Sequence, residues 1–253
     1  MSAYYNEFDP YTAQWLRNLI TAGHIADGEV DERSIADVHA DDLKGFTQCH
    51  FFAGIGGWSL AARLAGWPDE RPLWTGSCPC QPFSIANLTD AKTKGSADPR
   101  HLWPEFYRLI RIVQPSAIFG EQVKDAIAWG WLDEVFGDLE SAGYACGATI
   151  VPASAVEADH ERQRLFWVAD CSGAGWKRYK QIECSSVGES SSLSINRSPF
   201  VDARRAMAGN YSHLLFDDGV SVGVERAATK GYGNAIVPQL AAEIIRSYQE
   251  ARQ

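Results

Sequence analysis

Hydrophobic and polar residues are patterned along the chain in a way that predicts helices and strands in turn. Apolar positions recur near the helical period in several stretches, Tyr11–Ala22 among them. The expected helices cover residues 11–22, 58–65, 102–113, 127–142 and 239–248. Short apolar runs bounded by turn residues predict strands at 49–53, 71–77, 116–119 and 165–169. Strands that alternate with helices favour an α/β domain with a doubly wound, mostly parallel sheet.

The stretch from about residue 171 to residue 230 has a different pattern. It is rich in serine and glycine, as in SSVGESSSLS, and its hydrophobic periodicity is weak. Such a composition is typical of a linker, a disordered insert or a small irregular recognition module. We therefore expect a main domain formed by 1–170 plus 231–253, and a separate small region at 171–230.

The charge of the chain gives a mixed indication about nucleic acid. A formal net charge of −9 argues by itself against a phosphate-rich partner. Residues 171–230, however, hold eight lysines and arginines against six acids. A locally basic region on an acidic body is therefore open, beside the simpler interpretation that these charges form a solvated surface.

Several features predict a soluble protein of a reducing compartment. No apolar run approaches the roughly 20 residues needed to span a bilayer. The start MSAYYNEFDP has neither the basic part nor the apolar part of a signal peptide. The six cysteines show no disulfide framework, so we expect free thiols and a cytoplasmic location.

FFAGIGGW, Phe51–Trp58, has the order of a strand, a glycine turn and a helix start. Glycines let backbone N–H groups approach a ligand at the positive end of a helix. A lone glycine turn can equally be a tight strand–helix connection. No Gly-Lys-Ser/Thr follows, so a phosphate loop for nucleoside triphosphates is excluded.

GSCPCQPFS, Gly76–Ser84, places two cysteines around one proline. Zinc sites and redox pairs use a two-residue spacer, which Cys78-x-Cys80 lacks, and no metal is expected. A nucleophile fits better, because Cys80 follows a predicted strand at the edge where α/β sheets place their chemistry. Taken alone, an inert turn cysteine would remain the simpler interpretation.

FAGIGG followed by PCQPFS resembles the cofactor-binding and catalytic motifs of the DNA cytosine-5 methyltransferases. Three further stretches resemble motifs of that family in the expected order: FGEQV at 119–123, HERQRLFWVA at 160–169 and GYGNAIVPQLA at 231–241. The resemblance implies a Rossmann-like, S-adenosylmethionine-dependent methyltransferase domain. It also implies that 171–230 is a small target-recognition region.

The resemblance assigns roles to individual residues. Cys80 attacks carbon 6 of a cytosine, Glu121 acts at ring nitrogen 3, and Arg164 binds the base carbonyl oxygen. Arg162 joins this catalytic set. Cys78 stands where the family usually has proline or phenylalanine, and we interpret it as structural. The target base must leave the helix, because the base stack covers both faces of its ring.

One part of the family pattern is displaced. The family separates the glycine turn from its cysteine by about 60 residues that carry two cofactor strands, whereas Gly57 and Cys80 lie 23 positions apart. NEFDPYTAQWLRNLI at 6–20 and RSIADVHADDLKG at 33–45 resemble the missing segments. We infer a rearranged chain in which these segments come first. The alternative is that 1–45 form an ordinary helical extension.

On this interpretation Glu7 binds the ribose, Phe8 packs against adenine, and Ser34 replaces the aspartate expected near the adenine amino group, with Asp31 as a substitute. The cofactor-binding residues implied by the motifs are Phe52, Ala53, Gly54, Gly56, Gly57, Glu7, Phe8, Ser34, Pro79, Asn234 and Ala235. The expected DNA contacts are Gln81, Ser84, Arg100, Lys177, Arg178, Arg204 and Arg205. Ile85–Arg100 would be the lid that closes over DNA.

The resemblance favours methylation of double-stranded DNA by a monomeric, membrane-free enzyme. A second interpretation is a transfer-RNA cytosine methyltransferase, since one branch of the family acts on RNA. A non-catalytic DNA-binding member of the fold, or an enzyme that transfers another group, are further alternatives. The compact length and the lack of an attached endonuclease suggest an orphan enzyme of phage type.

Overall fold

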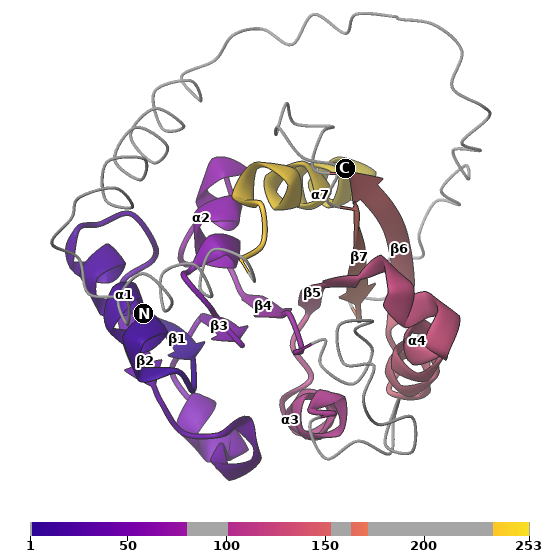
Figure 1. Ribbon diagram of the computed structural model, residues 1–253, viewed down its shortest axis with the longest axis horizontal. Helices are drawn as coiled ribbons and strands as arrows, with labels where there is room; N and C mark the ends of the chain where they lie inside the picture. The colour runs from indigo at the N-terminus through magenta and orange to yellow at the C-terminus, as the bar shows by residue number, and fades with distance from the viewer. Residues whose placement is uncertain (1, 80–100, 153–162, 172–234, 253) are drawn as a thin grey trace, which may run out of the picture. The chain divides into compact units, whose positions relative to one another are not determined.

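A seven-stranded sheet in the order β2-β1-β3-β4-β5-β7-β6 forms the centre of the fold (Figure 1). The computed structural model describes residues 2–79, 101–152, 163–171 and 235–252. The strands are β1 (Ala3–Asn6), β2 (Gly28–Asp31), β3 (Gln48–Phe51), β4 (Leu73–Gly76), β5 (Ala117–Val123), β6 (Ala145–Pro152) and β7 (Gln163–Asp170). The first five strands of the sheet run parallel, and β7 runs antiparallel to both of its neighbours. The predicted mostly parallel α/β sheet is confirmed.

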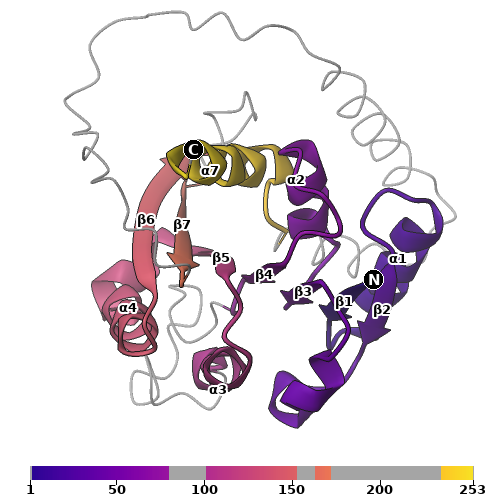
Figure 2. The same ribbon diagram turned by 180° about the vertical axis from the view of Figure 1, so that it is seen from behind.

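Helices cover both faces of this sheet, as the two opposite views show (Figures 1 and 2). One face carries α1 (Pro10–Thr21), α2 (Gly57–Leu64) and α7 (Pro238–Ala251). The other face carries α3 (Trp103–Val113), α4 (Trp131–Ser141) and the short 3-10 turns η1 (Ile35–Asp37) and η2 (Ala40–Leu43). The fold is therefore an α/β/α sandwich, and all described residues belong to one compact unit. No helix in this part of the chain is long and apolar enough to cross a membrane.

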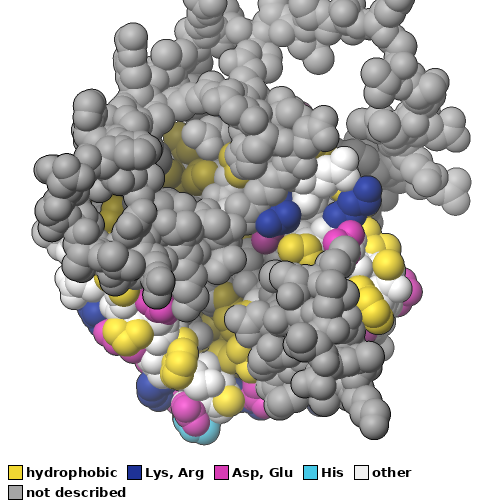
Figure 3. Space-filling view, in the orientation of Figure 1, with side chains coloured by type: hydrophobic (Ala, Val, Ile, Leu, Met, Phe, Trp, Pro, Cys, Tyr) yellow, Lys and Arg dark blue, Asp and Glu magenta, His cyan; other side chains and the backbone are white. Residues whose placement is uncertain are grey.

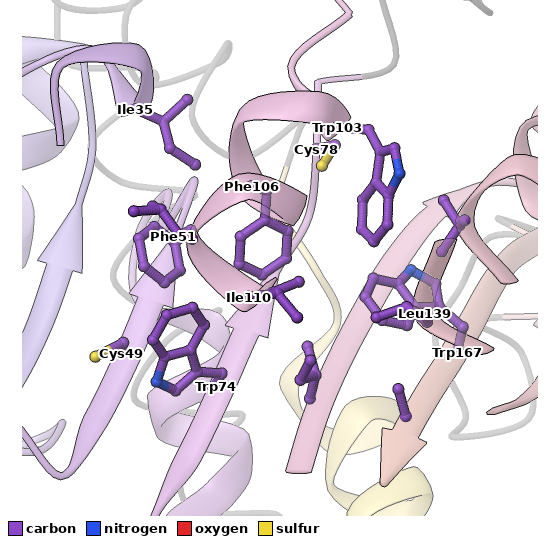
Figure 4. Packing of buried hydrophobic residues seen from close by; sticks show 14 of the residues in the cluster. Ile35, Cys49, Phe51, Trp74, Cys78, Trp103, Phe106, Ile110, Leu139 and Trp167 are labelled. Atoms are coloured by element: carbon purple, nitrogen blue, oxygen red, sulfur yellow. The ribbon is translucent and has the colours of Figure 1, made fainter. Parts of the chain in front are cut away.

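Large aromatic side chains fill the space between the sheet and α3 (Figure 4). Phe51 of β3 lies 5.0 Å, centroid to centroid, from both Trp74 of β4 and Phe106 of α3. Trp103 packs edge-on against Trp167 of β7, with 5.8 Å between ring centroids. Rings of this size bury a large apolar area and prefer tilted contacts, so they hold α3 firmly on the sheet.

Local sequence signals set the start of α1. Asp9 is the N-cap, and its carboxylate accepts a hydrogen bond from the Thr12 amide at 3.1 Å. Pro10 follows at the first helical position, where its missing N–H costs nothing. This start fixes the direction of α1 immediately after β1, and so fixes the short connection that holds Glu7 and Phe8.

Two sequence-based expectations need correction. The expected helix at 127–142 is divided: η4 (Lys124–Trp129) ends at Gly130, whose φ of 74° lies in the left-handed region, and α4 begins afterwards. An α-helix cannot continue through that conformation.

The strands β1, β2 and β6 were not expected from periodicity. β1 and β2 are four residues long, and all of β1 is buried, so neither shows the alternation that marks a half-buried strand.

Candidate active site at the carboxyl edge of the sheet

Four of the parallel strands deliver candidate site residues to the same edge of the sheet. β1 runs into Glu7, β2 into the Arg33–Ser34 pair, β3 into the glycine turn and β4 into Cys78 and Pro79. The carboxyl ends of parallel strands meet at one edge, which is where open α/β sheets bind their ligands. The four segments that resemble the ribose, adenine, glycine-turn and cysteine motifs therefore end at the same edge of the sheet.

The glycine turn after β3 has an unusual backbone. Gly54 and Gly56 have φ values of 54° and 79°, and Phe52, which is not a glycine, has φ 52°. Non-glycine residues rarely adopt this conformation, and when they do it is often at a functional site. A Cβ added at Gly54 would have no atom within 4 Å, so this side of the turn is open. Ala53 donates its amide to the Asn6 carbonyl at 3.0 Å, which joins the turn to β1.

Glu7 connects the end of β1 to this turn. One carboxylate oxygen accepts from the Gly54 amide at 2.8 Å, and the other accepts from the Asp9 amide at 2.9 Å. The neighbouring Phe8 ring is 71% exposed. A fixed carboxylate beside an open glycine turn and an exposed ring can receive hydroxyl donors and a flat apolar group.

The end of β2 holds the two candidates for an adenine contact. The Asp31 carboxylate receives Arg33 at 2.7 Å and the Tyr4 hydroxyl at 2.7 Å. Burial opposes ionisation of Asp31, but hydrogen bonds from Arg33 and Tyr4 outweigh it and lower the pKa of its carboxyl. Ser34 caps η1 by accepting from the Ala36 amide at 3.3 Å. Asp31 is thus engaged at both oxygens, whereas the Ser34 hydroxyl oxygen has a second lone pair that can accept a hydrogen bond from an amino group.

The segment before α7 packs on the glycine turn. A Cβ added at Gly57 would overlap a methyl group of Ile236, so this position accepts only glycine at the present spacing. Ala235 is the residue that precedes this contact. The C-terminal motif and the glycine turn, which are far apart in sequence, are therefore in contact.

A buried ion pair links two catalytic candidates. The Glu121 side chain lies in β5 and the Arg164 side chain in β7, with 2.7 Å between Arg164 Nε and Glu121 Oε1. Their side chains are only 9% and 21% exposed. In the β5–β7 ladder Arg164 is opposite Val123, two positions from Glu121, so both side chains leave the same face. At the same end, Lys124 donates to the Gln163 side chain at 2.8 Å.

The turn after β4 contacts the strand that carries Glu121. Gln122 donates its side-chain amide to the Cys78 carbonyl at 3.3 Å, and its oxygen accepts from the Val123 amide at 2.9 Å. The Cys78 thiol is buried in the same apolar cluster as Trp103 and Phe106 (Figure 4). Burial raises the pKa of this thiol, which suits the structural role expected for it and makes a thiolate there costly.

Ten predicted site residues lie outside the described residues: Cys80, Gln81, Ser84, Arg100, Arg162, Lys177, Arg178, Arg204, Arg205 and Asn234. The structure brings together Glu7, Phe8, Phe52, Ala53, Gly54, Gly56, Gly57 and Ala235 around the glycine turn, and pairs Glu121 with Arg164. Sequence reasoning missed Gln122 as a link to the cysteine turn, and missed the hydrogen bond of Trp58 to Ser77 at 2.9 Å. No fixed spacing predicts such contacts.

On the face in Figure 3, the basic side chains of the described residues stand singly beside acidic ones, with no broad basic patch among them. Within the same described residues, no group of three or more His, Cys, Asp or Glu side chains could hold a metal ion.

Comparison with known proteins adds an independent line of argument. A family model described as C-5 cytosine-specific DNA methylase matches residues 67–198. Two similar bacterial proteins are the type II methyltransferase M.HgiCII of Herpetosiphon aurantiacus, 32% identical over 123 residues, and the type II methyltransferase M.AplI of Arthrospira platensis, 30% identical over 175 residues. The matches cover 34% and 55% of this chain. The chain spans 27% and 50% of the length of these two curated relatives.

Solved structures with a similar arrangement include a mutant of Spodoptera frugiperda DNMT2. It is 15% identical, has a TM-score of 0.47, and the match covers 71% of this chain and 45% of that one. A putative DNA modification methyltransferase encoded within a prophage of E. coli is 18% identical with a TM-score of 0.39, over 67% of this chain and 47% of that one.

Proposed function

The chain belongs to the C-5 cytosine-specific DNA methylase family, and we propose that it transfers a methyl group from S-adenosylmethionine to carbon 5 of a flipped cytosine in double-stranded DNA. The observation that carries the proposal is the buried Glu121–Arg164 pair, 2.7 Å apart. It lies on β5 and β7, and β5 is the neighbour of the strand that runs into Cys80. A carboxylate, a guanidinium and a cysteine side chain meet the needs of cytosine attack.

The residues around the glycine turn fit S-adenosylmethionine. The open side of Gly54 offers space for close approach, the Glu7 carboxylate suits ribose hydroxyls, and the exposed Phe8 ring suits adenine. We assign the adenine amino contact to Ser34, because the Arg33 guanidinium binds both oxygens of Asp31 and the Tyr4 hydroxyl binds one of them. The two Glu7 oxygens, by contrast, each accept a neutral backbone amide. When bound, S-adenosylmethionine supplies the methyl group for carbon 5.

The chain's own residues would drive addition and elimination at the base. The Cys80 sulfur forms a bond to carbon 6, and the electron pair of the 5,6 double bond becomes available at carbon 5. Glu121 exchanges a proton with ring nitrogen 3, which makes the ring a better electrophile. Arg164 binds the carbonyl oxygen and stabilises its growing negative charge. After carbon 5 has been alkylated, a base takes its proton, the double bond re-forms and the sulfur leaves.

DNA recognition is assigned to segments beyond the described residues. We propose Gln81, Ser84 and Arg100 as contacts near the flipped base. The basic residues of 171–230, with Lys177, Arg178, Arg204 and Arg205 as the first candidates, would contact the duplex. A recognition region of about 60 residues favours a short target site. We further propose a monomer that acts in the cytoplasm, where the described cysteines 49, 78, 146 and 171 would remain the free thiols that they are here.

We also propose that the cofactor segments are rearranged relative to the family's usual order. β1 pairs in parallel with both β2 and β3, so the strand that leads to Glu7 is the direct neighbour of the strand that leads to the glycine turn. The ribose, adenine and glycine-turn segments thus lie in one half of the sheet although the first two precede the third in sequence. A cofactor site depends on this spatial order and not on chain order.

The test is a methylation assay on unmethylated plasmid DNA with S-adenosylmethionine, followed by digestion to nucleosides and mass detection of 5-methylcytosine. Wild-type protein is expected to produce the modified base, and Cys80→Ala to produce none. Cofactor binding without DNA methylation would contradict the DNA substrate, and transfer RNA would then be assayed. Methylation that survives Cys80→Ala would contradict the covalent mechanism. DNA binding without S-adenosylmethionine binding would identify a non-catalytic member of the fold.

A further inference from the structure

The turn that leads from β4 into Cys80 is held by side chains of two other elements. Trp58, in the first turn of α2, donates its indole N–H to the Ser77 hydroxyl at 2.9 Å. Gln122, in β5, donates to the carbonyl of Cys78 at 3.3 Å. Ser77 and Cys78 are consecutive, so two hydrogen bonds fix neighbouring residues of one short turn.

Each of the two donors is itself rigidly placed. The Trp58 ring is 2% exposed and packs at 6.2 Å, centroid to centroid, against both Phe119 of β5 and Phe166 of β7. The Gln122 side chain is 1% exposed, and its oxygen accepts from the Val123 amide at 2.9 Å, which fixes the orientation of its amide. Buried donors with defined partners leave the turn little freedom, because breaking either bond would strand a polar group away from water.

The turn cannot move far toward α3 either. A Cβ added at Gly76 would overlap the ring of Phe106, so the backbone lies directly against that ring. Cys78 also places its side chain in the apolar cluster that contains Phe106. Hydrogen bonds from α2 and β5 and apolar packing against α3 together determine where this backbone lies.

The two hydrogen-bond donors, Trp58 and Gln122, are sequence neighbours of the proposed cofactor site and of the proposed base site. Trp58 directly follows Gly57 of the glycine turn, where we place the cofactor. Gln122 directly follows Glu121, where we place the proton exchange with the base. Cys80 follows Cys78 by two positions in the sequence, and Cys78 and Ser77 are held by both donors.

We propose that Trp58 and Gln122 are positioning residues for the nucleophile: they hold Ser77 and Cys78 so that the chain enters Cys80 in register with the glycine turn and with Glu121. This inference rests on the proposed function and adds to it two residues that touch neither the base nor the cofactor. Because a displacement of about 1 Å at a reacting centre can cost roughly 100-fold in rate, loss of either bond lowers the rate of attack more than it lowers binding.

The experiment measures how fast the covalent adduct accumulates. Duplex DNA with 5-fluorocytosine in place of cytosine, together with S-adenosylmethionine, traps the adduct, because carbon 5 then carries fluorine, which a base cannot remove as a proton. The rate of adduct formation is followed for wild type, Trp58→Phe, Ser77→Ala, their double variant and Gln122→Leu. The Kd for S-adenosylmethionine and the KM for DNA are measured beside it.

We expect Trp58→Phe and Ser77→Ala each to slow trapping about 10-fold, and the double variant to be no slower than either, because all three remove the same bond. Gln122→Leu is expected to slow trapping 10-fold to 100-fold. The Kd for S-adenosylmethionine and the KM for DNA should change less than 3-fold in every variant, on the order expected when binding groups are untouched.

Trp67→Phe is the matched control. Trp67 is also 2% exposed, lies in the same apolar cluster as Trp58, and donates its indole N–H to the Arg71 carbonyl at 3.1 Å, away from the turn. It should lose stability without slower trapping. Equal trapping by wild type and the turn variants, or equal slowing by Trp67→Phe, would overturn the inference. A wild-type protein that forms neither adduct nor 5-methylcytosine would instead overturn the proposed function, and the inference with it.

Discussion

At the scale of single residues, the Glu121–Arg164 pair shows how the site combines stability with chemistry. The pair is mostly buried, and a buried carboxylate without its guanidinium is costly. Arg164→Ala should therefore lower the free energy of unfolding by about 3 kcal/mol. It should also reduce methylation at least 100-fold, because the charge developing on the base carbonyl loses its cation.

Urea unfolding and the nucleoside assay measure these two effects of Arg164→Ala. Lys124→Ala is the control, since Lys124 binds Gln163 at the same end of β7 in an exposed position. It should change stability by about 0.5 kcal/mol or less. Adding Glu121→Gln to Arg164→Ala should cost less than the sum of the single changes, because the stranded carboxylate is removed. Strict additivity would argue against a coupled pair.

Glu7 gives a prediction about cofactor binding. Its carboxylate accepts from the Gly54 amide and lies beside the open side of the glycine turn. Hydrogen bonds to a charged group contribute about 1.5 to 3 kcal/mol, so Glu7→Ala should weaken S-adenosylmethionine binding on the order of 10-fold to 100-fold. Isothermal titration calorimetry measures this affinity.

The control for Glu7 is Asp9→Ala, two positions along the chain. It removes the N-cap of α1 and should cost about 1 kcal/mol of stability while leaving the affinity nearly unchanged. If Glu7→Ala bound S-adenosylmethionine as tightly as wild type, the N-terminal segment would not be the ribose-binding element.

Part of the candidate site, as an arrangement of residues, could be predicted from the sequence. Motif order pointed to Glu121, Arg164 and the glycine turn, because these residue types stand in a recognisable succession. The Gln122–Cys78 and Trp58–Ser77 bonds were not visible, because they join residues 44 and 19 positions apart and depend on side-chain direction. Likewise, our proposal of Ser34 over Asp31 rests on the contacts of Arg33 and Tyr4 with Asp31, which the sequence does not indicate.

At the scale of elements, β3 carries a buried histidine that should make the sheet sensitive to acid. His50 Nδ1 lies 2.9 Å from the Thr75 hydroxyl, and its ring stacks on Tyr5. Burial lowers the pKa of His50 from 6.5 to about 3, against a small opposing effect of the Asp69 carboxylate. The folded protein thus keeps a neutral ring over a range where the unfolded chain binds a proton.

The stability that His50 contributes is present above about pH 6.5 and is lost as the pH falls from there toward about 3. At pH 5.0 the loss relative to pH 7.5 should be about 2 kcal/mol, from 1.36 kcal/mol per pKa unit. Urea unfolding at the two pH values measures it. His50→Asn should shrink the difference by that amount, whereas replacement of the exposed His24 should not. An unchanged difference in His50→Asn would show that this ring has the same pKa in the folded protein as in the unfolded chain.

Helices could be predicted from the sequence where the helical pattern of apolar residues extends over several turns. The helices expected at 58–65, 102–113 and 239–248 correspond to α2, α3 and α7 within a few residues. The strands β1 and β2 were not predicted, because four residues are too few to show a hydrophobic periodicity and because every residue of β1 is buried. The break at Gly130 was not predicted, because the apolar pattern continues across this residue. The division of the helix follows from the left-handed backbone of Gly130, which the pattern does not show.

At the scale of the whole molecule, the rearranged order can be tested by reversing it. Ala3, Gln48 and Leu73 start neighbouring parallel strands in register, so the starts of β1, β3 and β4 lie about 5 Å apart in succession. Thr47 also donates to the Ser2 carbonyl at 3.1 Å, and Leu73 to the Thr47 carbonyl at 3.3 Å. The two junctions that a reordered chain must make, residue 70 to residue 2 and residue 45 to residue 71, therefore lie at the same end of these neighbouring strands.

A chain written as residues 46–70, a short glycine-serine linker, residues 2–45, a second linker and residues 71–253 restores the family's usual order. We expect it to fold with the same circular dichroism spectrum and to bind S-adenosylmethionine within about 10-fold of wild type, because loop closure adds only on the order of 1 kcal/mol. The same reordering with Glu7→Ala should bind no better than Glu7→Ala alone. A reordered chain that folds but does not bind S-adenosylmethionine would contradict the rearrangement. Residues 2–45 would then contact the glycine turn productively only in the present chain order, and they would not be a transposed cofactor segment.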